Sequence, residues 1–112
     1  NDWATQLRQE MQSHSPTALW ITLEVLRAAR RLTLKGCLQL DAELAHRHMT
    51  NPALADFYEG VRAKLVTKTG QPKWSPANLL DLDVSALNGL LQDALRHPQV
   101  QPPWIFDRDY EQ

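Results

Sequence analysis

The sequence has little of what marks a secreted or a membrane protein. Its 112 residues contain one cysteine, Cys37, so no disulfide can form within the chain. No apolar run approaches the roughly 20 residues that a membrane-spanning helix needs. The opening residues, NDWATQLRQE, lack the character of a signal peptide. We therefore expect a cytoplasmic chain without membrane contact.

An excess of charge of one sign is also missing. The 12 basic and 13 acidic residues give a net charge of -1 and are interspersed along the chain. Nucleic-acid affinity depends on clustered cations that release counterions from the phosphate backbone. A nucleic-acid partner is therefore not expected.

The sequence lacks motifs for metal binding or local catalysis. Its four histidines are His14, His46, His48 and His97. His46 and His48 are two residues apart on an expected helix and so point to different faces, and neither cysteine nor carboxylate completes a set with metal-ligand spacing. Neither a Gly-rich phosphate loop nor a nucleophile elbow is found. We predict no metal, no separate cofactor and no catalytic residue in this chain.

Helix signals dominate what is there. Trp3, Leu7 and Met11 recur every fourth residue on a first helix, with Asp2 as its expected N-cap. Ser15-Pro16 and Asn51-Pro52 each place a capping side chain before a proline that suits the first helical turn. The later helices are expected at about 16–31, 33–49, 51–66 and 84–95. The fold class is therefore all-α, with about five helices in a single domain.

The helical domain is expected to cover residues 1–96. After His97-Pro98 the chain changes character, because Pro102-Pro103 excludes regular helix. Trp104, Ile105 and Phe106 then place three large apolar side chains together. We predict that residues 97–112 form a Pro-rich docking tail.

Several motifs between residues 3 and 80 follow the order of one family. Ser15-Pro16-Thr17 is followed by Leu19, Thr22 and Leu23, residues 59–63 read EGVRA, and Lys68, Pro72, Trp74 and Pro76 come next. This order resembles the C-terminal helical region of the 3-hydroxyisobutyryl-CoA hydrolases, members of the crotonase (enoyl-CoA hydratase/isomerase) superfamily. Asp41 departs from the family's usual glutamate, and Thr67 stands where aspartate commonly precedes the lysine.

The resemblance implies a part of a short-chain acyl-CoA thioester hydrolase. In that family a larger N-terminal core holds the acyl-CoA and the catalytic groups, while C-terminal helices cover the active site and support subunit contacts. The expected partners are thus a crotonase-type core, on the same or a separate chain, and acyl-CoA, with self-association through exposed apolar surface. The chain alone is predicted to be inactive. A non-catalytic interaction or structural module, or a fragment of an enoyl-CoA hydratase/isomerase, is the alternative.

Three lysines flank the Gly70 loop, namely Lys64, Lys68 and Lys73. A flexible ammonium suits a phosphate as a point charge, so they are candidates to contact the CoA phosphates. The resemblance favours Lys68 among them. Solvated surface lysines are the plainer interpretation.

Other residues are given structural roles. Asp41 lies on a helix face with Leu34, Cys37, Leu38, Leu44, Ala45 and His48, and a buried carboxylate needs a partner. We predict a structural ion pair between Asp41 and Arg62. Gly60 inside a helix indicates a close approach, for which helix packing is favoured over a ligand. Trp74 is expected to pin its loop to the helices.

Overall fold

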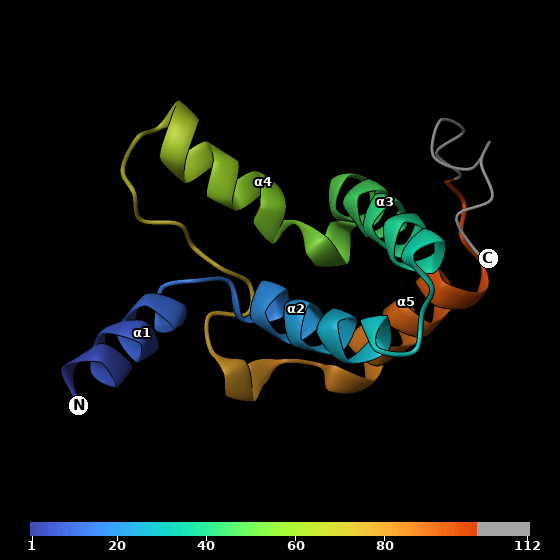
Figure 1. Cartoon of the computed structure of the whole chain (residues 1–112). Helices are drawn as coiled ribbons and strands as arrows, with labels where there is room; N and C mark the ends of the chain where they lie inside the picture. The colour runs from blue at the N-terminus through green and yellow to red at the C-terminus, as the bar shows by residue number, and fades with distance from the viewer. Residues whose placement is uncertain (101–112) are drawn as a thin grey trace.

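The computed structural model describes residues 1–100, and these form an all-α fold, as predicted (Figure 1). No strand occurs in this part of the chain. The helices are α1 (Asp2–Gln12), α2 (Pro16–Ala29), α3 (Leu34–Thr50), α4 (Asp56–Val61) and α5 (Val84–Arg96). A π-helical turn, Arg62–Val66, continues α4, and short 3-10 turns cover Pro52–Leu54 and Leu79–Asp81. None of the helices within residues 1–100 is long and apolar enough to cross a membrane.

Short polar side chains fix where the helices begin. Ser15 Oγ accepts a hydrogen bond from the Ala18 N–H at the start of α2, where Pro16 takes the first helical position. Thr33 and Asp83 cap α3 and α5 in the same way. At α1 the cap is Asn1 rather than the expected Asp2, because the Asn1 side chain accepts from the Trp3 N–H.

The core lies where α2, α3 and α5 meet. Its buried apolar side chains are Ile21, Leu40, Leu44, Leu54, Leu87, Leu91 and Ala94. By contrast α1 and α4 contribute no buried residue, and both extend away from this core in Figure 1. The helical body therefore has a small closed core and two helices that lie outside it.

The buried face of α3 differs from the predicted one. Leu40, Glu43, Leu44 and Arg47 are buried, whereas Leu34 is 63% exposed and Ala45 is also exposed. The apolar pattern pointed to a face that begins with Leu34. Glu43 and Arg47 pair with each other at helical spacing, so a face with two charges is buried instead.

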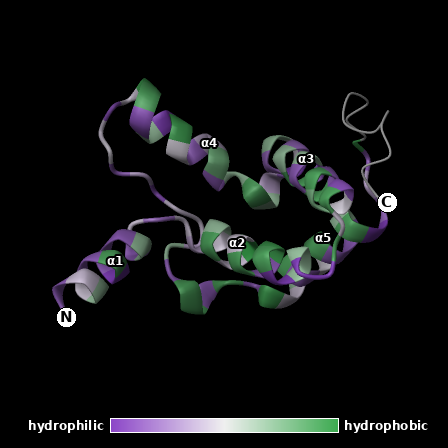
Figure 2. Ribbon diagram, viewed as in Figure 1, coloured by the Kyte–Doolittle hydropathy of each residue, from purple (hydrophilic) through white to green (hydrophobic). Residues whose placement is uncertain are grey.

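The apolar face of α4 and its π-helical turn has no cover within residues 1–100. Leu54, Phe57, Tyr58, Val61 and Leu65 recur at helical spacing in the sequence, and of these only Leu54 is buried. Phe57, Val61 and Leu65 follow one another at intervals of four residues and are 39–67% exposed. We call these three side chains the α4 face; hydrophobic residues recur along this helix in Figure 2.

The helical body ends with Arg96, the last residue of α5. Of the predicted docking tail, 97–112, only residues 97–100 are described, and residues 101–112, including Trp104, Ile105 and Phe106, lie outside the described part.

Candidate functional site

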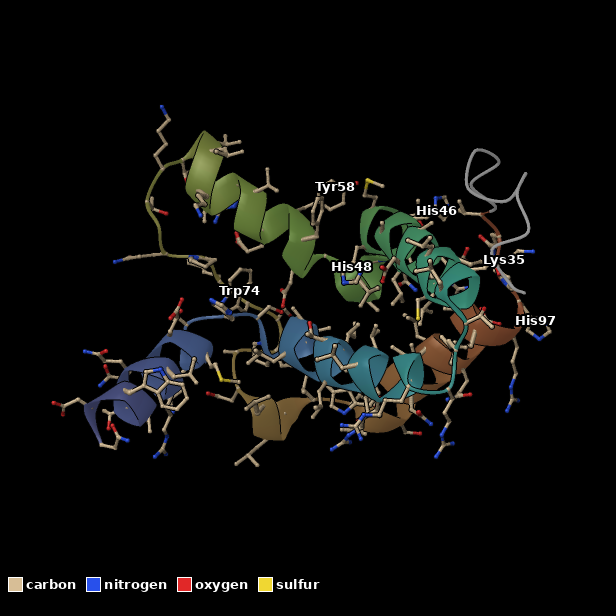
Figure 3. The ribbon with its side chains drawn as sticks, in the orientation of Figure 1. Lys35, His46, His48, Tyr58, Trp74 and His97 are labelled. Atoms are coloured by element: carbon tan, nitrogen blue, oxygen red, sulfur yellow. The ribbon has the colours of Figure 1, made fainter. Side chains whose placement is uncertain are left out.

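A cavity of about 790 Å³ lies between the start of α2, the end of α3, and α4 with its following loop. The α4 face forms one side of it, and Trp74 and His48 contribute from the loop and from α3. In Figure 3 both of these side chains lie between α4 and α2. Apolar atoms make up most of the lining, while Ser13, Ser15, Asp56 and Lys64 add polar groups. Such a mostly apolar concavity with a few polar groups is typical of a binding surface.

Trp74 forms a wall of the cavity and pins the loop to the helices, as the sequence indicates. Its indole Nε1 donates a hydrogen bond of 2.9 Å to the Ser13 carbonyl oxygen between α1 and α2. The ring also covers Gly60, where an added Cβ would lie 3.2 Å from Trp74 Cη2. The close approach expected at Gly60 therefore exists, but an aromatic ring makes it rather than another helix.

Asp56 holds two segments together at the cavity's edge. Ser15 Oγ donates to Asp56 Oδ2 at 2.5 Å, and the Ser75 backbone N–H donates to Asp56 Oδ1 at 2.9 Å. One carboxylate thus joins the start of α2, the first turn of α4 and the end of the Trp74 loop. Sequence reasoning gave Asp56 no role, since its two partners are 41 and 19 residues away.

The predicted ion pair between Asp41 and Arg62 is wrong. Asp41 is exposed on α3, and Arg62 donates through Nε to Glu59 Oε1 at 2.6 Å. The hydrogen bond from Arg62 lowers the pKa of Glu59 and outweighs the opposing effect of desolvation. Arg62 does not need Asp41 as a partner, because Glu59 lies three residues before it on the same helix and within reach.

Among residues 1–100, the buried charged side chains are Glu43 and Arg47. Arg47 Nε donates to Glu43 Oε1 at 3.0 Å, and Arg47 Nη1 donates to Asp93 Oδ2 on α5 at 2.8 Å. Burial alone would raise the pKa of Glu43, but hydrogen bonds from the Val100 N–H, Arg47 and the Gln99 N–H bring it below its ordinary value. Burial would lower the pKa of Arg47, and hydrogen bonds to Asp93 and Glu43 raise it overall. The four-residue spacing of Glu43 and Arg47 was the signal available in the sequence.

Only one of the three candidate lysines lines the cavity. Lys64 belongs to the π-helical turn and contributes to the lining, whereas Lys68 and Lys73 do not. Lys68 has a left-handed backbone, with φ of 55°, and Lys73 is held through its backbone N–H, which donates to Glu59 Oε2 at 3.4 Å. A contact of these lysines with CoA phosphates stays a prediction.

The histidines and the cysteine are dispersed. Within residues 1–100, no three His, Cys, Asp or Glu side chains come together in a way that could hold a metal ion. His48 Nδ1 lies 2.7 Å from the Leu44 carbonyl oxygen, so this nitrogen carries the proton and Nε2 is an acceptor when the ring is neutral. Cys37 is half-buried, with Sγ 3.9 Å from the Ala29 carbonyl oxygen.

Comparison with known proteins identifies the family. The sequence profile of the enoyl-CoA hydratase/isomerase family matches residues 1–91. The chain is 34% identical over 92 residues to the 3-hydroxyisobutyryl-CoA hydrolase-like protein 5 of Arabidopsis thaliana, which covers 82% of this chain and 24% of that protein. It is 42% identical over 74 residues to the mitochondrial 3-hydroxyisobutyryl-CoA hydrolase of Rattus norvegicus, covering 66% of this chain and 18% of the relative. The chain therefore belongs to the enoyl-CoA hydratase/isomerase family, and the resemblance found in its motifs is confirmed.

A third relative has a different kind of name. The small ribosomal subunit protein mS47 of Arabidopsis thaliana is 35% identical over 82 residues, covering 73% of this chain and 20% of that protein. The chain thus spans about a quarter or less of the length of these relatives. No solved structure matches it.

Proposed function

We propose that this chain is the helical part of a short-chain acyl-CoA thioester hydrolase and covers the active site of a crotonase-type core. Several relatives carry the name 3-hydroxyisobutyryl-CoA hydrolase, and this chain equals only a fraction of their length. The catalytic groups would then lie on the core, and 3-hydroxyisobutyryl-CoA is the proposed substrate. A cytoplasmic location is proposed as well, although the names of some relatives include "mitochondrial".

One observation carries this proposal, namely the α4 face beside a cavity with a mostly apolar lining. Phe57, Val61 and Leu65 expose large apolar side chains along one side of α4 and its π-helical turn, in which only Ala63 is buried. Soluble proteins rarely expose such contiguous apolar surface unless it meets a partner. A core that packs on this face would bury it and close the cavity. Without the core, the same face is expected to promote self-association.

Lys64 is the cation best placed for a CoA phosphate under this proposal. It lies in the cavity lining, and the π-helical turn that carries it is a type of local distortion often found at functional sites. Lys68 and Lys73 lie near but outside that lining and would contribute only at the rim.

The test is thiol release from 3-hydroxyisobutyryl-CoA. It compares this chain with the protein from the longest reading frame that contains it. We expect activity only in the longer protein, and a double variant there, Phe57→Asp with Val61→Asp, should lose activity because the α4 face no longer packs. Asp41→Asn, an exposed change on α3, is the control. Turnover by the 112 residues alone, or full activity in the double variant, would contradict the proposal.

A second function has its own support. The relative mS47 is by its name a protein of the small ribosomal subunit, and in this second proposal the helical body serves as a non-catalytic interaction module. In that case the longer protein would lack thioesterase activity and co-purify with a large assembly instead. The same assay, combined with size-exclusion chromatography of cell extract, separates these two functions.

A further inference from the structure

The side chain of Glu43 is fully buried and accepts hydrogen bonds from the segment that follows α5. The Gln99 and Val100 backbone N–H groups both donate to Glu43 Oε2, each at 2.8 Å. The other oxygen, Oε1, accepts from Arg47 Nε at 3.0 Å. One carboxylate thus receives two consecutive N–H groups, an arrangement that favours the ionised form.

Arg47 extends this contact to α5 and to the start of the segment. Its Nη1 donates to Asp93 on α5 at 2.8 Å, and its Nη2 lies 3.5 Å from the His97 carbonyl oxygen. Within residues 97–100, then, Glu43 and Arg47 bond only backbone atoms. The side chains of Gln99 and Val100 take no part in these bonds.

The helical core does not depend on this segment. The cluster of buried apolar residues comes from α2, α3, α5 and Leu54, and residues 97–100 are not among its members. Breaking the bonds to Gln99 and Val100 would therefore remove polar contacts without opening an apolar cavity. The polar contacts to residues 97–100 are therefore separable from the apolar contacts of the core.

We propose that Glu43 and Arg47 form a backbone anchor for residues 97–100, and that this anchor can open while the helices stay folded. It holds the chain against α3 after α5 ends and so fixes the point from which the chain continues beyond Val100. Because the anchor binds backbone N–H groups, we expect it to hold residues 99 and 100 whatever their side chains are. Proline is the exception, since it has no N–H to donate.

Amide hydrogen exchange of the full chain, followed by NMR, tests the anchor. Val100→Pro removes one donor and should speed exchange of the Gln99 amide by about tenfold or more, the size expected for charge-assisted hydrogen bonds. Val100→Ala keeps the N–H and should leave the Gln99 amide protected. Glu43→Gln should speed exchange of the Gln99 and Val100 amides, while the Leu44 and Leu91 amides keep their protection. Asp41→Asn, an exposed change two residues earlier, serves as the control.

Three results would overturn the anchor. If the Gln99 amide exchanges in the parent chain as fast as an unprotected amide, the segment is not held. If Val100→Ala matches Val100→Pro, the valine side chain holds the segment rather than its N–H. If Glu43→Gln exposes the Leu44 and Leu91 amides as much as that of Gln99, then Glu43 supports the whole body and no separate opening exists.

Discussion

At the scale of single residues, two glycines in helices have opposite surroundings. An added Cβ at Gly60 would lie 3.2 Å from the ring of Trp74, whereas at Gly89 in α5 it would meet nothing within 4 Å. Alanine is favoured over glycine in a helix interior by about 1 kcal/mol. We expect Gly89→Ala to raise the free energy of unfolding by about 0.5–1 kcal/mol, measured by urea denaturation.

Gly60→Ala should lack this gain, because its methyl group displaces the Trp74 ring. The hydrogen bond from the indole to Ser13 then weakens, and the Trp74 indole N–H exchanges faster in NMR spectra. If Gly60→Ala stabilises the chain as much as Gly89→Ala and leaves that indole signal unchanged, the ring does not constrain the helix.

Two charged residues of α3 also differ in what their removal should cost. Arg47→Ala leaves the Glu43 carboxylate buried without its cation, and breaking a buried pair in this way typically costs about 3–5 kcal/mol. Asp41 is exposed and has no part in this pair, so Asp41→Ala should change stability by less than about 0.5 kcal/mol. Thermal unfolding of both variants, monitored by circular dichroism, gives the comparison. Equal effects of the two substitutions would mean that the buried network contributes little.

At the scale of helices, the sequence predicts where elements begin better than which face they bury. Ser15-Pro16 and Thr33 mark the starts of α2 and α3, because capping needs only atoms within three residues. The burial of Glu43 and Arg47 on α3 depends instead on Asp93 and residues 97–100, which lie about 50 residues away. A pattern of apolar residues cannot show that a pair of opposite charges will be covered.

The α4 helix shows the reverse case. Its apolar periodicity is clear in the sequence, but most of that face is exposed, because residues 1–100 provide nothing to cover it. The cavity beside it was not predictable either, since Ser13, His48 and Trp74 come from three separate segments. The motif EGVRA identified the family, yet the arginine in it serves a local pair with Glu59.

At the scale of the whole molecule, stability should depend on pH through Glu43. Its pKa in the folded chain lies below the ordinary value of 4.5, so it binds protons more readily when the chain is unfolded. The stability it contributes is therefore fully present above pH 4.5 and is lost as the pH falls through the lowered folded value. At pH values below 4.5 we expect the thermal unfolding temperature to decrease, and we expect it to decrease less in Glu43→Gln.

The contribution of Glu59 to the acid dependence of stability must be measured separately, because the pKa of Glu59 is lowered too, chiefly by Arg62. Glu59→Gln removes that second contribution and should keep most of the acid dependence, since its ion pair with Arg62 lies near the surface. An acid dependence that disappears in Glu59→Gln and persists in Glu43→Gln would reverse this assignment.

The hydrogen bond from Trp74 to Ser13 joins residues 61 positions apart. The loop that it closes contains α2, α3 and α4, and the entropic cost of bringing the ends of a loop together grows with its length. Contacts of such long separation tend to form after local structure. The Trp74 indole is thus a probe of folding, whose signal reports when this long-range junction has formed.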